Sequence, residues 1–410
     1  MLALAELAQA LFRLLGALPL DRLSPVDWRR LAELGRKAES MAWAADREPR
    51  VRGGTFVSSV PATATAQMAD PQWRSAIRAY PDDRHRQWLD DQVLGGAREL
   101  AGQPEERTKA EPERFTRLML GLPKDTHEAH FEALIRGLSD GSLPPDILVA
   151  VAERGHTRPG RPHGRWLPRM IASHAEAGLP PALLGLVVWY ASQDPDPNIE
   201  LWRPSPQSAT GCYGGSPYGH GINSARGSEA HALAQLIAQD VEHWRHLEPT
   251  LGLMADDTSL AVRTCVAEAG TQALCHDRPK AIALFLRLCT LGDALLASAP
   301  IERFLNDTAA YDFDAVLPVL SAMLASPLAE ARQTRARQVM RAALSLEAAR
   351  RWADRALPGD ASMRQGAAQV LATNLLAAPD RAYVEAQLIA LFHNRTPRYA
   401  ARRLSGSDPL

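Results

Sequence analysis

Apolar residues recur along most of this chain at the three-to-four-residue spacing of amphipathic α-helices. In the second half, such segments alternate with short turns rich in Asp, Ser, Pro and Gly. Proline and glycine interrupt helices, and Ser or Asp favours their first residues, so the turns mark helix boundaries. This pattern predicts helix pairs at 224–238 with 243–255, 258–274 with 278–290, 293–305 with 312–325, 328–344 with 346–356, and 361–377 with 380–393.

An arginine recurs near the start of one helix in most of these pairs. The steps between successive copies are 37, 69, 32 and 34 residues, a period near 35 with one double step. Such a period is typical of helical repeat arrays, because one helix pair cannot bury its apolar face alone and stacks on its neighbours. We expect each arginine to bond carbonyl groups or an acidic turn residue of the adjacent repeat. The recurring arginines are Arg226, Arg263, Arg332, Arg364 and Arg398.

The first half carries a weaker form of the same signal. The strings Leu143-Pro144-Pro145 and Leu179-Pro180-Pro181 lie 36 residues apart and open similar apolar segments. We therefore expect the same helix pairs in the first half, with more additional segments inserted between them. The pattern predicts helices at 2–17, 24–46, 83–104, 111–121, 126–138, 165–177 and 180–192, and a long loop at 47–75 with an extended piece near 55–60.

These segments predict an all-α fold, a right-handed α-solenoid of HEAT-like antiparallel helix pairs with long inserted loops. The largest interruption is the glycine- and proline-rich stretch at 193–223, and structureless loops of that length are usually functional or disordered. The expected organisation is an N-terminal helical segment and loop over 1–75, irregular helical repeats over 76–192, an inserted loop over 193–223, regular repeats over 224–404 and a tail over 405–410.

Composition narrows the function classes. The chain has 410 residues, of which 46% are hydrophobic and 23% charged, and its formal net charge of −1 creates no global field for nucleic acid or anionic membrane. Its four cysteines have no metal-ligand spacing, which favours core thiols in a reducing cytoplasm. The apolar start carries Glu6 and Arg13 and resembles neither a signal peptide nor a membrane span. We expect a cytoplasmic protein with no membrane partner.

The usual catalytic and cofactor motifs are missing from the sequence. It contains no G-x-x-x-x-G-K-[ST] phosphate loop and no G-x-S-x-G elbow after a strand. The histidines of His127-Glu128-Ala129-His130 have the wrong spacing for a zincin, and a site at His243 and His246 would need ligands from other helices. We expect no metal, no cofactor and no catalytic residue.

The stretch 193–226 holds the best candidates for partner binding. Asp194 and Asp196 each precede a proline, so we expect them to end the 180–192 helix rather than bind a cation. Large aromatic side chains beside polar ones suit a recognition surface. The alternative is that this loop folds back over the groove of the array, with Arg226 fixing it. The candidate binding residues are Trp202, Arg203, Tyr213, Tyr218, His220, Asn223 and Arg226.

Two arginine clusters offer an electrostatic alternative. Arg154, Arg158, Arg161, Arg165 and Arg169 line a loop, which suits an acidic or phosphate-bearing partner or simple solvation. A second group gives one helix pair a basic edge with few carboxylates nearby and Trp352 as the lone aromatic. That edge is either a solvated face or a phosphate-binding surface with poor base recognition. It comprises Arg332, Arg335, Arg337, Arg341, Arg350, Arg351 and Arg355.

Several strings between about residues 70 and 404 resemble the C-terminal helical region of bacterial STAND (NACHT-like) antiphage-defence NTPases. In that family an effector and a P-loop ATPase precede a repeat region thought to sense a foreign component. The resemblance implies a sensor fragment, a stand-alone relative or one product of a split gene, and no catalytic residue. Its strings are Pro112-Glu113-Arg114-Phe115, the segment 131–138, Gly160-Arg161-Pro162 with Arg165-Trp166, Trp189-Tyr190-Ala191 with Asp194-Pro195-Asp196-Pro197, the segment 221–227, and the Asp257 to Arg263 D-x-x-x-x-V-R turn.

The sequence thus favours a non-catalytic recognition or scaffold module that binds a protein partner, as the sensor part of a bacterial defence system would. Nucleic-acid binding through the basic edge is the first alternative, and it predicts affinity that falls steeply with salt. A metal-dependent hydrolase is the second, and it requires Asp194, Asp196 and His220 to converge.

Overall fold

The computed structural model describes residues 24–40, 55–84, 87–89, 92–140, 143–206, 208–290, 292–354 and 359–393. Within these ranges the chain is mainly helical, with three strands of three residues each. The predicted all-α class is therefore confirmed. The predicted helix at 2–17, the recurring Arg398 and the tail at 405–410 lie outside the described residues.

The described residues form two compact units. The first contains the amphipathic helix α2 (Pro25–Ser40), the start of β1 (Thr55–Val57), and a hairpin of β2 (Gln87–Leu89) and β3 (Gln92–Leu94). The strand order in the sheet is β1-β3-β2, and β2 pairs antiparallel with β3 so that Trp88 lies opposite Val93. The extended piece predicted near 55–60 is therefore present.

Two predictions in this part of the chain were wrong. Where the sequence predicted one helix over 83–104, the hairpin occupies 87–94, because Trp, Leu and Val suit a strand surface. The helix starts only at Ala97, after Gly95-Gly96, and a Cβ on Gly96 would lie 2.3 Å from the Asp82 carbonyl oxygen. The loop predicted over 47–75 contains two helices, α3 (Ala62–Thr65) and α4 (Asp70–Ala79).

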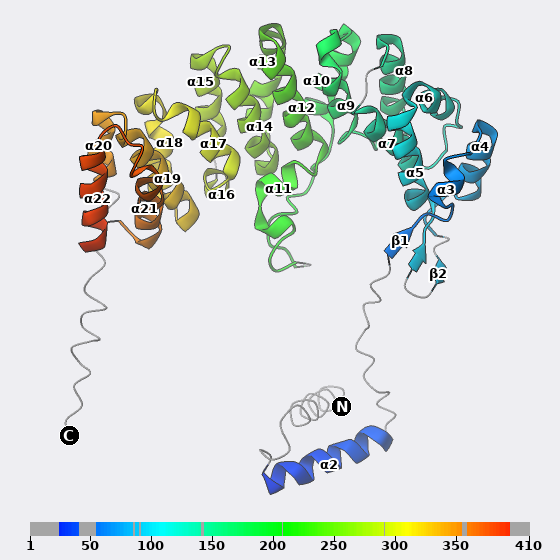
Figure 1. Cartoon of the computed structure of the whole chain (residues 1–410), viewed down its shortest axis with the longest axis horizontal. Helices are drawn as coiled ribbons and strands as arrows, with labels where there is room; N and C mark the ends of the chain where they lie inside the picture. The colour runs from blue at the N-terminus through cyan, green and yellow to red at the C-terminus, as the bar shows by residue number, and fades with distance from the viewer. Residues whose placement is uncertain are drawn as a thin grey trace. The chain divides into compact units, whose positions relative to one another are not determined.

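The second unit is built from two sets of helices, and successive members of the first set pack on one another throughout. Figure 1 shows α8, α10, α13 and α15 along one edge, with α9, α12, α14 and α17 beneath them. The helices that we call the first row are α5 (Ala97–Ala110), α7 (Glu128–Leu138), α9 (Leu167–Ser173), α12 (Ala225–Gln239), α14 (Leu260–Ala273), α17 (Ala299–Thr308), α19 (Ala329–Ala343) and α21 (Ala361–Asn374).

The second row packs against the first, and one apolar core runs between the two from Ile77 to Leu391. The short helices α11 (Pro217–Gly221) and α16 (Asp293–Leu296) lie outside both rows and pack on α14. The second row consists of α6 (Pro112–Leu120), α8 (Pro145–His156), α10 (Pro181–Gln193), α13 (Val241–Ala255), α15 (Arg278–Leu288), α18 (Phe313–Ala325), α20 (Glu347–Ala353) and α22 (Arg381–His393).

The turn residues determine where the first-row helices begin. The side chains of Ser224, Ser259 and Asp360 accept hydrogen bonds from backbone amides in the first turns of α12, α14 and α21, at 3.3, 3.4 and 3.0 Å. These caps satisfy amides that have no partner within the helix. The helix pairs predicted between 224 and 393 are confirmed to within a few residues, with 293–305 divided into α16 and α17.

The predicted arginine ladder is present in part: Arg226 and Arg332 reach an acidic turn residue of the next repeat, whereas Arg263 and Arg364 bond the turn before their own helix. Arg263, Arg332 and Arg364 each stand at the fourth residue of a first-row helix and donate to a carbonyl of the turn before it, those of Asp257 (2.5 Å), Ser326 (2.6 Å) and Gly359. Arg332 also reaches forward to Asp360 at 2.6 Å. Each guanidinium therefore ties a helix to its turn, and Arg332 ties two neighbouring repeats together.

Other charged side chains connect first-row helices at the same interval. Arg136 pairs with Glu105 at 3.1 Å, Arg303 with Glu268 at 2.9 Å and Arg337 with Glu302 at 2.6 Å. Their partners lie 31, 35 and 35 residues earlier, which is one repeat back. Ion pairs thus connect neighbouring helices of the first row at three steps.

We predict that Arg226→Met lowers the free energy of unfolding by about 2–4 kcal/mol. Arg226 and Asp257 pair at 2.8 Å with both side chains only 12% exposed, so the substitution leaves a largely buried carboxylate without its cation. Urea denaturation followed by circular dichroism measures the change.

The matched control is Arg245→Met, whose i,i+3 pair with Glu242 is about two-thirds exposed. It should change stability by less than about 0.5 kcal/mol. Equal effects of the two substitutions would contradict a structural role for Arg226.

Candidate recognition site

The insertion at 193–226 starts where α10 ends and returns to the start of α12. The Asp194 carboxylate accepts the Asp196 backbone amide at 2.9 Å, and the Asp196 carboxylate accepts the Ala225 amide at 2.7 Å. Asp194 therefore ends α10 as predicted. Asp196 does not end α10 but accepts the first backbone amide of α12, beside the Ser224 cap, and this contact depends on the return of the chain after the insertion.

Arg226 fixes the base of the insertion, as the sequence suggested. Its guanidinium donates to the carbonyl oxygens of Asp194 (2.6 Å) and Pro197 (3.1 Å) and forms the pair with Asp257. One side chain therefore joins the end of α10, the insertion and the turn before α14. Because this side chain is mostly buried, Arg226 supports the insertion and is not itself available as a binding residue.

Trp202 and Arg203 are held by one acidic residue that sequence reasoning missed. Glu200 accepts the Trp202 indole N–H and lies 3.8 Å from the Arg203 guanidinium, which stacks 5.1 Å from the Trp202 ring centroid. Glu200 also accepts the hydroxyl of Ser259, the residue that caps α14. Trp202 is half-buried and Arg203 is exposed, so the pair presents a guanidinium backed by an indole.

Tyr213 and His220 form a stacked pair with ring centroids 5.5 Å apart and an interplanar angle of 17°. His220 is buried, and its burial lowers the pKa of the imidazole, so the ring is neutral near pH 7. Tyr213 lies on the outside of the stack and is 42% exposed. Of these two candidates, Tyr213 can touch a partner while His220 supports it.

Tyr218 and Asn223 attach the insertion to first-row helices. The Tyr218 hydroxyl donates to Glu268 of α14 at 2.7 Å, and the Asn223 side chain accepts from Arg165 and donates to the Gly219 carbonyl at 2.8 Å. A Cβ on Gly221 would lie 2.4 Å from the Cys265 sulfur, so α11 approaches α14 closely only because that residue is glycine.

The insertion also exposes large apolar side chains that the sequence reading passed over. Ile199, Leu201 and Ile222 are 64, 45 and 39% exposed, and Tyr213 adds an aromatic ring. Their signal in the sequence is isolated apolar residues within a stretch of turn formers, which periodicity does not detect. Exposed apolar groups on a well-fixed loop are typical of protein-binding surfaces.

Each of the three residues that the hydrolase alternative requires has a structural contact. Asp194 and Asp196 direct carboxylate oxygens to backbone amides, and His220 is stacked beneath Tyr213. In the part of the chain that the structure describes, no group of three or more His, Cys, Asp or Glu residues is placed to hold a metal ion.

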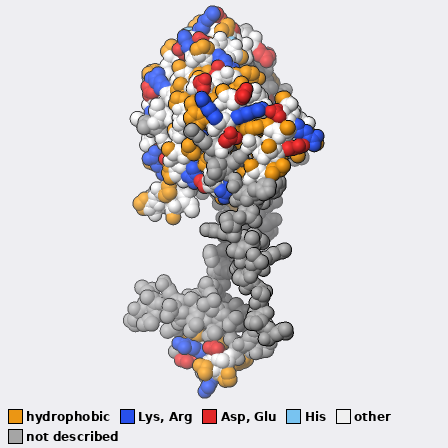
Figure 2. Space-filling view, turned by 90° about the vertical axis from the view of Figure 1, so that its left-hand side faces the viewer, with side chains coloured by type: hydrophobic (Ala, Val, Ile, Leu, Met, Phe, Trp, Pro, Cys, Tyr) orange, Lys and Arg blue, Asp and Glu red, His pale blue; other side chains and the backbone are white. Residues whose placement is uncertain are grey.

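The basic edge is largely compensated. Arg332, Arg337 and Arg350 pair with Asp360, Glu302 and Asp380, carboxylates that lie about one repeat away in the sequence. The interpretation that carboxylates are few there was wrong, because they come from neighbouring repeats. Figure 2 shows acidic and basic side chains interspersed at this end of the chain. Of the others, Arg335 is buried, Arg341 bonds Asn306, Arg351 is exposed beside Trp352, and Arg355 lies outside the described residues.

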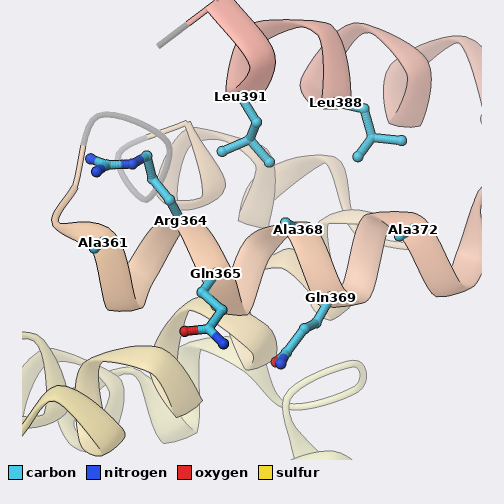
Figure 3. A pocket seen from close by; sticks show the side chains of 8 residues that line it. All are labelled: Ala361, Arg364, Gln365, Ala368, Gln369, Ala372, Leu388 and Leu391. Carbon is cyan, nitrogen blue, oxygen red and sulfur yellow. The ribbon is translucent and has the colours of Figure 1, made fainter. Parts of the chain in front are cut away.

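A hollow of about 650 Å³ lies between α21 and α22. Figure 3 shows Leu388 and Leu391 of α22 directed toward Ala368 and Ala372 of α21, while Gln365 and Gln369 point away from α22. Its walls are mostly aliphatic, with Arg364 at one end engaged with the Gly359 carbonyl. The hollow therefore offers apolar volume and few polar groups for specific recognition.

Glu229 is an unexpected buried acid on α12. Its side chain is fully buried, and among the described residues neither carboxylate oxygen has a hydrogen-bond partner. Burial, with the nearby charge of Asp194, raises the pKa of Glu229 well above its ordinary value. The buried site therefore favours the neutral, protonated form of this carboxyl group.

Comparison with known proteins does not classify the chain: no family model, no curated protein and no solved structure matches it. Among the described helices, none is both long enough and apolar enough to cross a membrane.

The described cysteines are all free, with Cys265 and Cys289 buried as predicted and Cys212 exposed. Cys275, expected in the core, is exposed instead.

We predict that Glu229→Gln stabilises the protein more at pH 8 than at pH 5. Because the folded-state pKa is raised, the folded protein keeps a proton that the unfolded chain releases above pH 4.5, and stability falls as the pH rises. The glutamine variant does not titrate, so its advantage should grow by about 1 kcal/mol or more across this range.

Urea denaturation at the two pH values measures this difference. The matched control is Glu330→Gln, which changes an exposed glutamate of α19 and should give the same difference from wild type at both pH values. A pH-independent effect of Glu229→Gln would mean that Glu229 is ionised in the folded protein.

Proposed function

We propose that this chain is a HEAT-like α-solenoid that acts as a non-catalytic recognition module for a protein partner. In this proposal the helix pairs are the scaffold, and the insertion at 193–226 is the main contact surface. The observation that carries it is the combination of exposed apolar side chains on the insertion with a firmly bonded base.

The contacts of the insertion support this proposal. Ile199, Leu201 and Tyr213 are exposed, while Arg226, Glu200 and Tyr218 bond the same segment to first-row helices and their turns. A surface that is already ordered loses little conformational entropy on binding, which favours affinity. The alternative that the loop only covers a groove leaves these exposed groups without a role.

The successive packing of first-row helices and the one-repeat spacing of their ion pairs support the solenoid part of the proposal. The resemblance to the sensor region of antiphage NTPases supports a bacterial defence role in the cytoplasm, with a foreign protein as the partner. We propose no catalytic activity, since Asp194, Asp196 and His220 each have a structural contact.

The test is affinity capture with the full chain as bait, from phage-infected and uninfected bacterial lysates at low and high salt. We expect a discrete protein from infected cells that is retained at high salt. Replacing Ile199, Leu201 and Tyr213 together with serine should reduce its capture at least about tenfold, because these side chains supply apolar contact area.

The matched control is Leu253→Ser, which removes an equally exposed apolar side chain from α13, outside the insertion. Its capture should equal that of the wild type. Undiminished capture by the triple variant would refute the insertion as the contact surface. Recovery of nucleic acid alone, lost at high salt, would favour the basic edge instead.

A further inference from the structure

A small hollow of about 210 Å³ lies between α9, α11 and α12, beside the base of the insertion. Arg165 and Arg169 line it together with Trp166, Tyr218 and His231, and no residue of its lining is acidic. The three helices are in contact with one another through α12, as their neighbouring positions in Figure 1 also show. The hollow is therefore a fixed feature of the second unit.

Neither arginine of this hollow has a carboxylate partner among the residues that the structure describes, unlike the arginines at three other first-row steps. Arg165 donates to the neutral amide oxygen of Asn223, and the exposed Arg169 has no ion pair among the residues that the structure describes. By contrast, Arg136, Arg303 and Arg337 each pair with a glutamate one repeat back. At the step from α9 to α12, Arg165 meets a neutral amide instead of a carboxylate.

The carboxylate that contacts two lining residues of the hollow is already engaged. Glu268 accepts the Tyr218 hydroxyl at 2.7 Å and the Arg303 guanidinium at 2.9 Å, and it lies 3.4 Å from the His231 ring nitrogen. It is itself only 9% exposed, whereas His231 is 52% exposed. Glu268 therefore orients Tyr218 and His231, which line the hollow, and Arg303 offsets its charge.

Trp166 restrains Arg165 of the hollow and also contacts Arg136 of α7. The guanidinium carbon of Arg165 lies 5.0 Å from the Trp166 ring centroid, and that of Arg136 lies 5.1 Å from it. Such cation–π contacts restrict a guanidinium to a plane, and a planar fork binds a carboxylate through two parallel hydrogen bonds. The site is consequently organised before a ligand arrives.

We propose that this hollow binds a carboxylate side chain from an acidic segment of the protein partner. This inference rests on the proposed function, and it adds the chemistry of the partner: aspartate or glutamate residues next to the apolar groups that meet the insertion. Tyr218 and the exposed Ile222 belong both to the hollow and to the insertion, so one partner can contact both.

The distribution of charged residues around the hollow favours an acidic peptide over a nucleic acid as its ligand. An adjoining hollow of about 320 Å³ shares Trp166 and Arg169, but it contains Glu105 and Asp140 beside Lys109. Positive charge therefore does not continue as the track that successive phosphates need. A hollow of about 210 Å³ accepts one carboxylate-bearing side chain, and guanidinium groups stack where a base would lie on Trp166.

The test is fluorescence anisotropy of a labelled hexaglutamate peptide with the full chain, with hexaglutamine, inorganic phosphate and a labelled hexathymidylate as the other probes. We expect saturable binding of hexaglutamate and none of hexaglutamine. Arg169→Gln and Arg165→Gln should each weaken hexaglutamate binding about tenfold, the loss expected for one charge-assisted contact. Arg169 is exposed, so its variant should fold normally, which circular dichroism checks.

The control is Arg351→Gln, which removes another exposed arginine beside a tryptophan, 5.9 Å from the Trp352 ring centroid. It should bind hexaglutamate as tightly as the wild type. The proposal would be overturned if hexaglutamate did not bind, or if it bound equally to the wild type and to Arg169→Gln. It would also be overturned if hexathymidylate or phosphate bound more tightly than hexaglutamate and depended on Arg169 in the same way. If a partner is still captured through the insertion, only this inference fails. If hexaglutamate binds at Arg169 but no partner is captured, the proposed function fails instead.

Discussion

The structure depends on one recurring interaction, an arginine near the start of a first-row helix that bonds the turn before that helix. The turn before α14 shows why this matters. Asp257 offers its carbonyl oxygen to Arg263 of its own repeat and its carboxylate to Arg226 of the preceding one. A helix pair exposes apolar area on both sides, and apolar packing alone does not specify how far neighbouring pairs rotate. Directional contacts such as the bidentate pair of Arg226 with Asp257 and the pair of Arg332 with Asp360 supply that geometry where they occur.

The same interaction makes the insertion part of the framework. Arg226 stands two residues into α12 and uses its remaining donors on the carbonyls of Asp194 and Pro197. A loop of this length would ordinarily move freely, because few buried groups restrain it. Here Glu200, Asp196 and Tyr218 add further bonds to α12 and α14, so the exposed side chains of the insertion have fixed positions.

Helix positions in the second half could be predicted from the sequence, because caps such as Ser259 and Asp360 and the apolar spacing are local signals. The hairpin at 87–94 could not, because its strand residues can also form a helix and only Gly95-Gly96 hints at the break. Acidic turn residues were expected as partners of the arginines, but which arginine meets which residue could not be predicted. Periodicity located Arg226 and Arg332, but Asp257 and Asp360 lie 31 and 28 residues further on, and their approach depends on how repeats stack. Glu229 and Ile199 gave no periodic signal at all.

Charge balance along the first row also bears on the contacts that we propose near the insertion. Where Arg303 and Arg337 meet glutamates of the preceding helix, the surface is locally neutral and its side chains are already engaged. At the step from α9 to α12 the glutamate is replaced by Asn223 of the insertion, which accepts from Arg165 without cancelling its charge. The insertion therefore does two things at one place: it adds exposed apolar groups, and it leaves arginines that a partner's carboxylates can neutralise. An ion pair completed only on binding contributes to specificity more than to the stability of the free chain, because the free arginines stay solvated until the partner arrives.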